Sequence, residues 1–563
     1  MNSSNDNVFS TNYLKGIRLA ILLISAFILI LISYIVFKPI NGLNGTKDGL
    51  IAKLYGFTLL FIIFLVGLFL KFKNKLKYDN VVLLIILIGL VLQMTYMLYT
   101  GGHTRQYDTW SSNNNAHYDY ALSFYLTGKL PNHHIDINSI YQFYHPPLNA
   151  FVQGMFMHIF EFICPVQSLR DSTEQLFSSC QILSCFYMFG GVLFFDKIVN
   201  GSNLSKQSKI IAITFISCFP RVLQLSGQLN NDAITVFLSS IGLLFFTRWT
   251  FKSKSMLNIG LTALFIGLAM MAKMSASIIC LGIGLSFILE FFKSLLKKGN
   301  SIKISRITIH YLVFLSICAP LGLWFQFYSH FVYDLPFNFV FSNLNSMLFT
   351  GTQDWVVAHK PNLLDYYDKN NLAMGEVYTS GLYNALIRYV SPFYIHDFKQ
   401  GLYCNTFDNY NILTFAIRSA IFGEFRYSTY LHGDIYAYTS IIFGFILWFL
   451  FIFGLVFIFV IRKKVKFGDD GNVAIYIFGG IILMYIYLQI SMPYGCSMDF
   501  RYIVPIILPI GYLIGKINDN LVFLKKEHIS KPKYIFTNIY RYSLLTVLIV
   551  FILSASLFYL LAI

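Results

Sequence analysis

Long apolar runs without charge constrain this chain more than any other feature of its sequence. A helix needs roughly 17–25 apolar residues to cross the hydrocarbon core of a bilayer. Because lipid offers no hydrogen-bond partners, each spanning helix must satisfy its own backbone polar groups. Apolar residues make up 56% of the 563-residue chain and charged residues 12%, whereas a soluble domain carries about 25% charged residues. The sequence therefore predicts an all-α polytopic membrane protein.

Fourteen apolar runs are candidate spans, and they lie at Arg18–Phe37, Ala52–Leu70, Val81–Tyr99, Pro147–Phe162, Leu176–Phe195, Ile210–Leu225, Ala233–Phe246, Leu257–Ala272, Ser275–Phe292, Ile309–Phe325, Thr439–Val460, Val473–Ile490, Tyr502–Ile514 and Leu544–Leu561. Their spacing predicts five parts. These are N-terminal transmembrane helices (1–99), a first outer loop (100–148), a transmembrane core (149–326), a long outer segment after the tenth run (327–438) and C-terminal transmembrane helices (439–563).

Basic residues gather in the short connections between runs, and such connections usually face the cytoplasm. The clusters begin at Lys71, Arg248, Lys293, Arg462 and Lys525. On this scheme the two long outer segments lie outside, together with the turns at Gln228–Asp232 and Met492–Arg501. The formal net charge of +16 is then a signal of the cytoplasmic face, and no nucleic-acid partner is expected.

One pair of runs conflicts with this topology. Lys197, Lys206 and Lys209 also have the character of a cytoplasmic connection. Two full crossings by Pro147–Phe162 and Leu176–Phe195 would place these lysines outside. One of the two runs is therefore expected to be partial, re-entrant or interfacial. About thirteen crossings remain, with the amino terminus inside and the carboxyl terminus outside.

Ionisable residues held at a membrane face are costly, so they usually mark a site. The first outer loop carries several, namely Arg105, Asp108, His117, Asp119 and His145, the last just before the Pro146–Pro147 pair. Further ionisable residues stand at span entrances, namely Asp232, Lys273, Asp499 and Arg501. A carboxylate there can take a proton from an acceptor hydroxyl, and Arg, Lys or His can hold a phosphate leaving group. The predicted outer face thus carries the groups needed for glycosyl transfer from a polyprenyl phosphate.

Structural interpretations stand beside these functional ones. Asp232 has the position of a helix cap, and Lys273 that of a lysine which extends to the interface. Arg501 is placed to pair with Asp499, and His117 and His145 can equally serve as hydrogen-bonded structural residues. Asp108 is the residue for which the functional interpretation is strongest.

These segments resemble bacterial membrane glycosyltransferases of the GT-C superfamily, which are related to the protein O-mannosyltransferases and the lipid A aminoarabinose transferases. The matching segments are, in order, RQYDTW, NAHYDYALSFYLTGKLP, FYHPPL, QLNNDAITVFLSSIGLLFFTRW, GLAMMAKMSA, AIFGEF and SMDFRYIVPIILP. They cover most of the chain from Arg105 to Pro509. The chain departs from the superfamily plan in having additional spans before the loop, and in carrying Asp119 where a small residue is expected.

The resemblance implies a GT-C-like bundle that transfers a sugar from a polyprenyl-phosphate donor, which enters laterally between helices. Asp108 would act on the acceptor. The donor phosphate or sugar would be held by Arg105, His117, His145, Lys273 and Arg501. The acceptor side, or the orientation of the basic groups, would depend on Asp119, Asp232, Glu424 and Asp499. No metal or other cofactor is expected, and the acceptor is an unidentified glycan, lipid or protein. The expected location is a bacterial plasma membrane, with the active site on the extracytoplasmic face.

A lipid-linked sugar flippase or transporter is the alternative function. Transporters often show paired repeats and interrupted helices that put polar groups near the midplane. Here no internal repeat is evident, and the polar residues gather at one face. A non-catalytic membrane subunit that keeps the fold is a third possibility, since resemblance in fold does not establish chemistry.

The long outer segment holds two shorter mixed runs, Leu382–Phe393 and Ile412–Phe425, which are predicted to be amphipathic helices on the membrane surface. They would either cover the site or only tie the helices together. Two cysteines predicted to lie outside, Cys404 and Cys496, either pair or stay reduced. The eight cysteines show no CxxC spacing that would indicate a metal or redox site.

Overall fold

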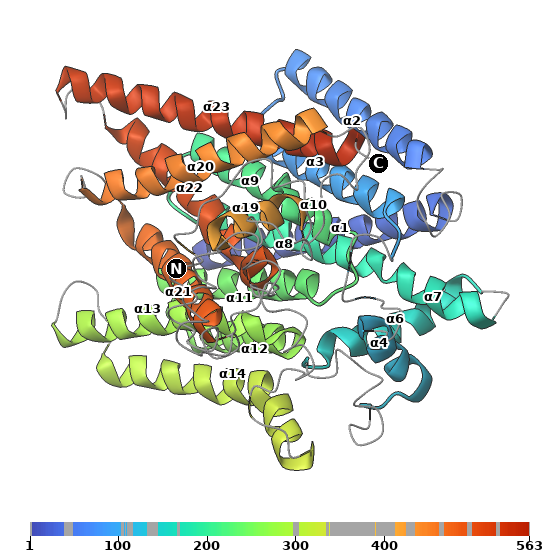
Figure 1. Ribbon diagram of the computed structural model, residues 1–563. Coiled ribbons are helices and arrows are strands. Elements are labelled where there is room, and N and C mark those ends of the chain that lie inside the picture. The colour runs from blue at the N-terminus through green and yellow to red at the C-terminus, as the bar shows by residue number, and fades with distance from the viewer. Residues whose placement is uncertain are drawn as a thin grey trace, which may run out of the picture.

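The fold is that of a computed structural model, and the part it describes consists of helices and their connections, without a strand (Figure 1). The structure describes residues 3–38, 49–102, 106, 109, 116–131, 145–165, 169–296, 303–333, 337, 389, 411–423, 434–460, 467–491, 498–524 and 530–561. Its helices are α1 (Ser3–Phe37), α2 (Gly49–Phe72), α3 (Tyr78–Tyr99), α4 (Ala116–Thr127), α6 (Leu148–Ile163), α7 (Leu169–Ser179), α8 (Gln181–Asn200), α9 (Lys206–Ser217), α10 (Pro220–Leu225), α11 (Asp232–Phe251), α12 (Met256–Ala272), η1 (Met274–Ala276), α13 (Ser277–Leu295), α14 (Ile304–Tyr333), α19 (Ile412–Phe422), α20 (Asp434–Val460), α21 (Gly468–Ser491), η8 (Phe500–Ile506), α22 (Ile507–Phe523) and α23 (Lys531–Leu561). The two η elements are 3-10 helices.

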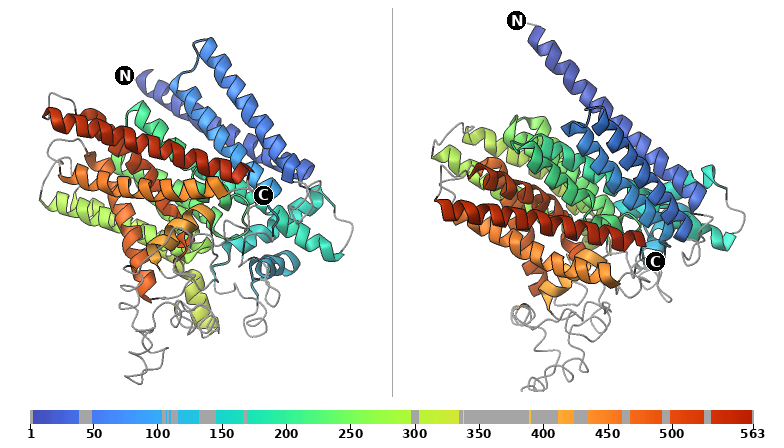
Figure 2. Two further views of the ribbon diagram at one scale, coloured as in Figure 1. Left: turned by 45° about the horizontal axis from the view of Figure 1, so that its top comes forward. Right: turned by 90° about the horizontal axis from the view of Figure 1, so that it is seen from above.

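The long helices run back and forth between two ends of one bundle. We name these ends after α11, which begins at Asp232 and passes Arg248 near its last turn. Eleven described helices are long and apolar enough to cross a membrane, and α12 and the α9–α10 pair run between the same two ends. Figure 2 shows α20 and α23 side by side, as two of these passes. The predicted all-α polytopic architecture is confirmed.

Contacts between helix ends fix the direction of each pass. At the Asp232 end, Gln181 Nε2 donates to the Thr100 oxygen (3.2 Å) and to the Gly227 oxygen (2.6 Å). Tyr99 Oη donates to the Tyr559 oxygen near the end of α23 (2.6 Å). At the other end, Tyr78 Oη donates to Asn200 Oδ1 (2.6 Å). The described chain therefore begins its first pass at the Arg248 end and finishes its last pass at the Asp232 end.

The perimeter of the bundle is apolar, as a lipid environment requires. Large side chains that are more than half exposed lie on many helices, among them Phe64, Leu257, Phe449, Leu483 and Ile539. A soluble protein rarely exposes contiguous apolar patches beyond a few hundred Å². The distribution therefore agrees with a chain whose outer helix faces contact acyl chains.

Helix α6 is the partial member of the conflicting pair. It has 16 residues, and both of its ends stay at the Asp232 end of the bundle. Near its start, Gln153 Nε2 donates to the Leu229 oxygen (2.7 Å). Near its end, Phe160 packs against Tyr34, with ring centroids 5.9 Å apart. Because α6 does not cross, the chain from α8 onward keeps the predicted direction, and Lys197 lies with the other basic residues at the Arg248 end.

Two sequence expectations are wrong in detail. The run Ile210–Leu225 is one pass but not one continuous helix, because α9 ends at Ser217 and α10 begins at Pro220, where proline suits the first helical position. The described part of the run Ile412–Phe425, up to Gly423, is not an exposed surface helix. It forms α19, which is mostly buried against α10, η8 and α20. The apparent amphipathic pattern arises because Arg418 and Ser419 face the protein interior. The run Leu382–Phe393 lies outside the described residues, apart from Tyr389.

Candidate functional site

Three connections meet at the Asp232 end: the turn before α11, the junction of α12 with η1, and the start of η8. Their central contact is an ion pair in which Lys273 Nζ lies 2.5 Å from Asp232 Oδ1. The exposed fractions of the two side chains are 6% and 3%. Lys273 therefore turns into the protein and does not extend to the interface.

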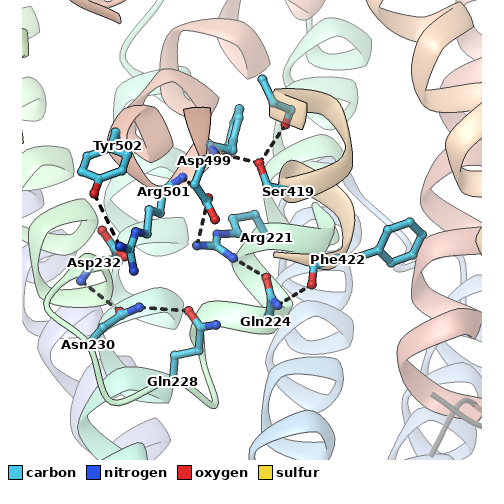
Figure 3. Close-up of polar contacts among 12 residues, drawn as sticks. Arg221, Gln224, Gln228, Asn230, Asp232, Ser419, Phe422, Asp499, Arg501 and Tyr502 are labelled. Carbon is cyan, nitrogen blue, oxygen red and sulfur yellow. Dashed lines mark hydrogen bonds and ion pairs between the residues drawn. The ribbon is translucent and has the colours of Figure 1, made fainter. Parts of the chain in front are cut away.

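The turn before α11 holds Asp232 in place without using its carboxylate as a helix cap. Asn231 occupies the N-cap position, and the Asp232 backbone N–H donates to Asn230 Oδ1 (3.1 Å). Asn230 Nδ2 in turn donates to Gln228 Oε1 (3.1 Å) (Figure 3). The second carboxylate oxygen, Asp232 Oδ2, is buried and has no hydrogen-bond partner among the described residues. A buried acceptor without a hydrogen-bond partner is costly, so this oxygen can accept one further hydrogen bond.

Two cationic side chains lie within cation–π distance of the Tyr502 ring. Lys273 Nζ lies 5.1 Å from the ring centroid and Arg501 Cζ lies 5.3 Å from it. An Arg501 guanidinium nitrogen also donates to Tyr502 Oη (3.4 Å). Cation–π attraction holds such groups near an aromatic face. The ring therefore keeps two positive charges close together, one from α12 and one from η8.

Two histidines complete this cluster. The rings of His117, on α4, and His145, before α6, are nearly parallel, with centroids 5.8 Å apart. Desolvation first, and then the nearby positive charges of His117, Lys273 and Arg501, hold the pKa of His145 well below its ordinary value. His145 is therefore neutral at pH 7 and lies within electrostatic range of both cations. We call Lys273, Arg501, Tyr502, His117 and His145, with Asp232, the cation cluster.

Asp499 belongs to a neighbouring buried network. Its Oδ1 lies 3.7 Å from an Arg221 guanidinium nitrogen, with both side chains 1% exposed. The same oxygen accepts the Arg501 backbone N–H (2.7 Å), so Asp499 caps η8. Figure 3 shows Asp499 directed at Arg221, while the Arg501 side chain extends toward Tyr502. Asp499 thus orients the backbone of Arg501, whereas the ion-pair partner of the Asp499 carboxylate is Arg221.

Arg221 was not among the predicted site residues. It donates to Gln224 Oε1 (2.5 Å), and Gln224 Nε2 donates to the Phe422 oxygen on α19 (2.8 Å). The sequence carried one signal for it, because Arg221 is the single charge within an apolar run and follows a proline. A charged side chain within an apolar, membrane-spanning run requires a partner inside the protein. The identity of that partner depends on a contact with η8, which lies far along the sequence.

Three predicted site residues, Arg105, Asp108 and Glu424, lie outside the described residues, as do Cys404 and Cys496. Asp119 lies half-buried in the first turn of α4, two residues after His117. The structure thus brings together Lys273, Arg501, His117, His145 and Asp232 and places Asp499 beside them. Within the described ranges, no three His, Cys, Asp or Glu side chains converge in a way that could hold a metal ion.

No protein-family model matches the chain. No curated protein matches it either. Among solved structures, it is similar to the crystal structure of the Archaeoglobus fulgidus oligosaccharyltransferase in the apo form, with 14% identity and a TM-score of 0.42. The match covers 84% of this chain and 56% of that one, so the chain spans little more than half the length of the protein it matches. Similarity at this level assigns neither a family nor an activity.

Proposed function

We propose that the chain is an integral membrane glycosyltransferase that moves a sugar from a polyprenyl-phosphate donor to an acceptor hydroxyl at the Asp232 end. One observation supports this most directly, namely that buried Lys273 and half-buried Arg501 both lie against the ring of Tyr502. Two fixed cations in a poorly solvated site suit a phosphodiester, because charge-assisted hydrogen bonds are strong there. Asp232 holds Lys273 in position.

The proposed reaction forms a bond between the acceptor oxygen and the anomeric carbon and breaks the bond from that carbon to a phosphate oxygen. Asp108 takes the acceptor proton as general base. Negative charge then grows on the departing polyprenyl phosphate, and Lys273 and Arg501 stabilise it. In the free protein the lowered pKa of His145 keeps it from adding a third positive charge to Lys273 and Arg501, and its ring can donate one hydrogen bond to the phosphate.

The basic residues indicate how the protein is oriented in the membrane. Lys71, Lys197, Arg248 and Lys293 lie in the last turns of α2, α8, α11 and α13, and all four helices end at the Arg248 end. The rule that basic connections face the cytoplasm supports an extracytoplasmic location for the cation cluster. A bacterial plasma membrane is the proposed location, and the donor sugar and the acceptor are unspecified.

The test is transfer from radiolabelled polyprenyl-phosphate sugars by membranes matched for expression. We expect Arg501→Met to lower the transfer rate by about 100-fold or more, since loss of one group that stabilises developing charge has an effect of that order. We expect Asp108→Asn to lower it by about 100-fold or more as well, since loss of a general base has a similar effect. The double variant Lys273→Met with Asp232→Asn removes a buried pair without leaving an uncompensated charge, and it should lose transfer while remaining folded.

A matched control removes a second ion pair, Lys254 with Glu290, which lies at the Arg248 end. The double variant Lys254→Met with Glu290→Gln should transfer sugar at the wild-type rate. Undiminished transfer by Arg501→Met would remove the cation cluster from the mechanism. Absence of transfer from every donor, together with movement of lipid-linked sugar across reconstituted vesicles, would favour the flippase.

A further inference from the structure

A second polar site lies at the opposite end of the molecule. A cavity of about 940 Å³ opens between α1, α8, α11, α21 and α22. It is lined at the Arg248 end by Arg18, Lys197, Arg248 and Lys252. The cavity uses none of the residues of the cation cluster, so the glycosyltransferase proposal does not explain it.

The charged residues that line the cavity are mainly basic. Two carboxylates line it, Asp79 and Asp470. Asp79 is exposed in the first turn of α3, whereas Asp470 is paired with Lys516 (3.1 Å) and accepts a hydrogen bond from Tyr512 Oη (2.5 Å). Lys197 is paired with Asp196 (3.2 Å). In the described part of the chain, no carboxylate lies within ion-pair distance of Arg18, Arg248 or Lys252. These three residues are therefore the cations available to an anion.

The walls of the cavity are apolar. Leu243 and Leu244 lie about one turn before Arg248 on α11, and they face the cavity together with Ile477 on α21 and Leu508 on α22. Cations and aliphatic side chains thus line the same cavity, about one helical turn apart on α11. A small hydrophilic anion would leave this apolar surface uncovered. An amphiphile with a phosphate head and a hydrocarbon chain matches both parts.

We propose that this cavity binds an anionic phospholipid from the membrane leaflet at the Arg248 end. Its phosphate lies against Arg18, Arg248 and Lys252, and one acyl chain lies along Leu244 and Ile477. Basic pockets between transmembrane helices recognise acidic lipid head groups through the same charge complementarity. The volume falls within the range of ligand pockets, about 300–1,000 Å³. This inference does not depend on the proposed transferase activity.

The experiment is a binding titration of the purified full-length chain in mild detergent, using fluorescent phosphatidylglycerol and, in parallel, fluorescent phosphatidylcholine of the same chain length. We expect phosphatidylglycerol to bind at least tenfold more tightly. The double variant Arg248→Gln with Lys252→Gln should lose this preference. Ala474→Phe, which places a ring in the cavity wall without changing charge, should weaken binding of phosphatidylglycerol by a similar factor.

The matched control is Lys73→Gln with Lys75→Gln, which removes two exposed charges from the same end of the bundle but outside the cavity. It should bind as the wild type does, and all variants should show the wild-type unfolding temperature. Equal binding of the two lipids would overturn the proposal, as would equal weakening by the control variant. Full competition by glycerol phosphate at lipid-like concentration would replace the lipid with a simple phosphate ligand.

Discussion

Buried charges decide the chemistry of this protein at the scale of single residues. Asp232, Lys273, Asp499 and Arg221 are each about 5% exposed or less, and each is held by a partner from a distant part of the sequence. Removing one partner of such a pair leaves an uncompensated charge and costs about 3–5 kcal/mol. The sequence indicated Asp232, Lys273 and Asp499 because they stand at span entrances. It did not indicate how they pair, since Lys273 binds Asp232 while Asp499 binds Arg221.

His145 should make binding of the donor depend on pH. Its pKa is well below the ordinary value in the free protein, because of desolvation and the charges of His117, Lys273 and Arg501. A bound phosphodiester brings negative charge beside the ring and raises that pKa. Protons are then taken up on binding, so affinity should rise as pH falls from about 7.5 to 5.5, by at most about tenfold per pH unit for one proton.

Binding of a non-transferable polyprenyl phosphodiester, measured over this pH range, tests the effect. The dependence should vanish in His145→Gln and persist in His158→Gln, which changes an exposed histidine on α6. A wild-type affinity that does not change with pH would show that His145 does not face the phosphate.

At the scale of elements, α19 is the helix whose position the sequence described least well. It lies inside the protein because Ser419 Oγ accepts the Phe500 N–H (2.8 Å) and its last carbonyls receive hydrogen bonds from Gln224 and Tyr559. Polar contacts of this kind make a short helix with a polar face suited to the interior. Its sequence alone gives the same pattern as a helix on a membrane surface.

Gly423, which follows α19, is predicted to be intolerant of substitution. Its φ is +69°, which L side chains rarely adopt, and a Cβ there would lie 2.1 Å from Gln224 Nε2. We expect Gly423→Ala to lower the free energy of unfolding by about 1–3 kcal/mol, through backbone strain and loss of the Gln224 contact. Thermal unfolding in detergent measures the change.

The control for this substitution is Gly479→Ala. Gly479 lies within α21 with no neighbouring atom within 4 Å of an added Cβ, so alanine there should be neutral or slightly stabilising. If Gly423→Ala unfolds at the wild-type temperature, the link between α19 and α10 contributes little to stability.

At the scale of the whole molecule, the number and direction of passes determine which groups share a face of the membrane. The first described pass begins at the Arg248 end and the last finishes at the Asp232 end. We therefore predict that the two termini lie on opposite sides of the membrane. Protease treatment of sealed inside-out and right-side-out vesicles, with an epitope tag at each end, measures this directly.

In right-side-out vesicles the carboxyl-terminal tag should be removed and the amino-terminal tag protected, and inside-out vesicles should give the reverse. Removal of both tags from vesicles of one orientation would mean that a described pass does not cross, and α9–α10, which is broken at Pro220, would be the first to examine. The conclusion on fold class would survive that result, whereas the orientation of the cation cluster would have to be revised.

The sequence by itself determined the class of protein, the position of most helices and the face on which polar residues gather. Those properties follow from local composition, because a membrane-spanning helix satisfies its backbone within itself and needs only a sufficiently long apolar run. Tertiary structure alone decided that α6 stays at one end, that α19 is buried, and that Arg221 pairs with Asp499. Each of these depends on contacts between residues far apart in the chain, and the free energy of burying a charge is set by the partner that meets it. The local pattern around Arg221 or Lys273 contains no information about that partner.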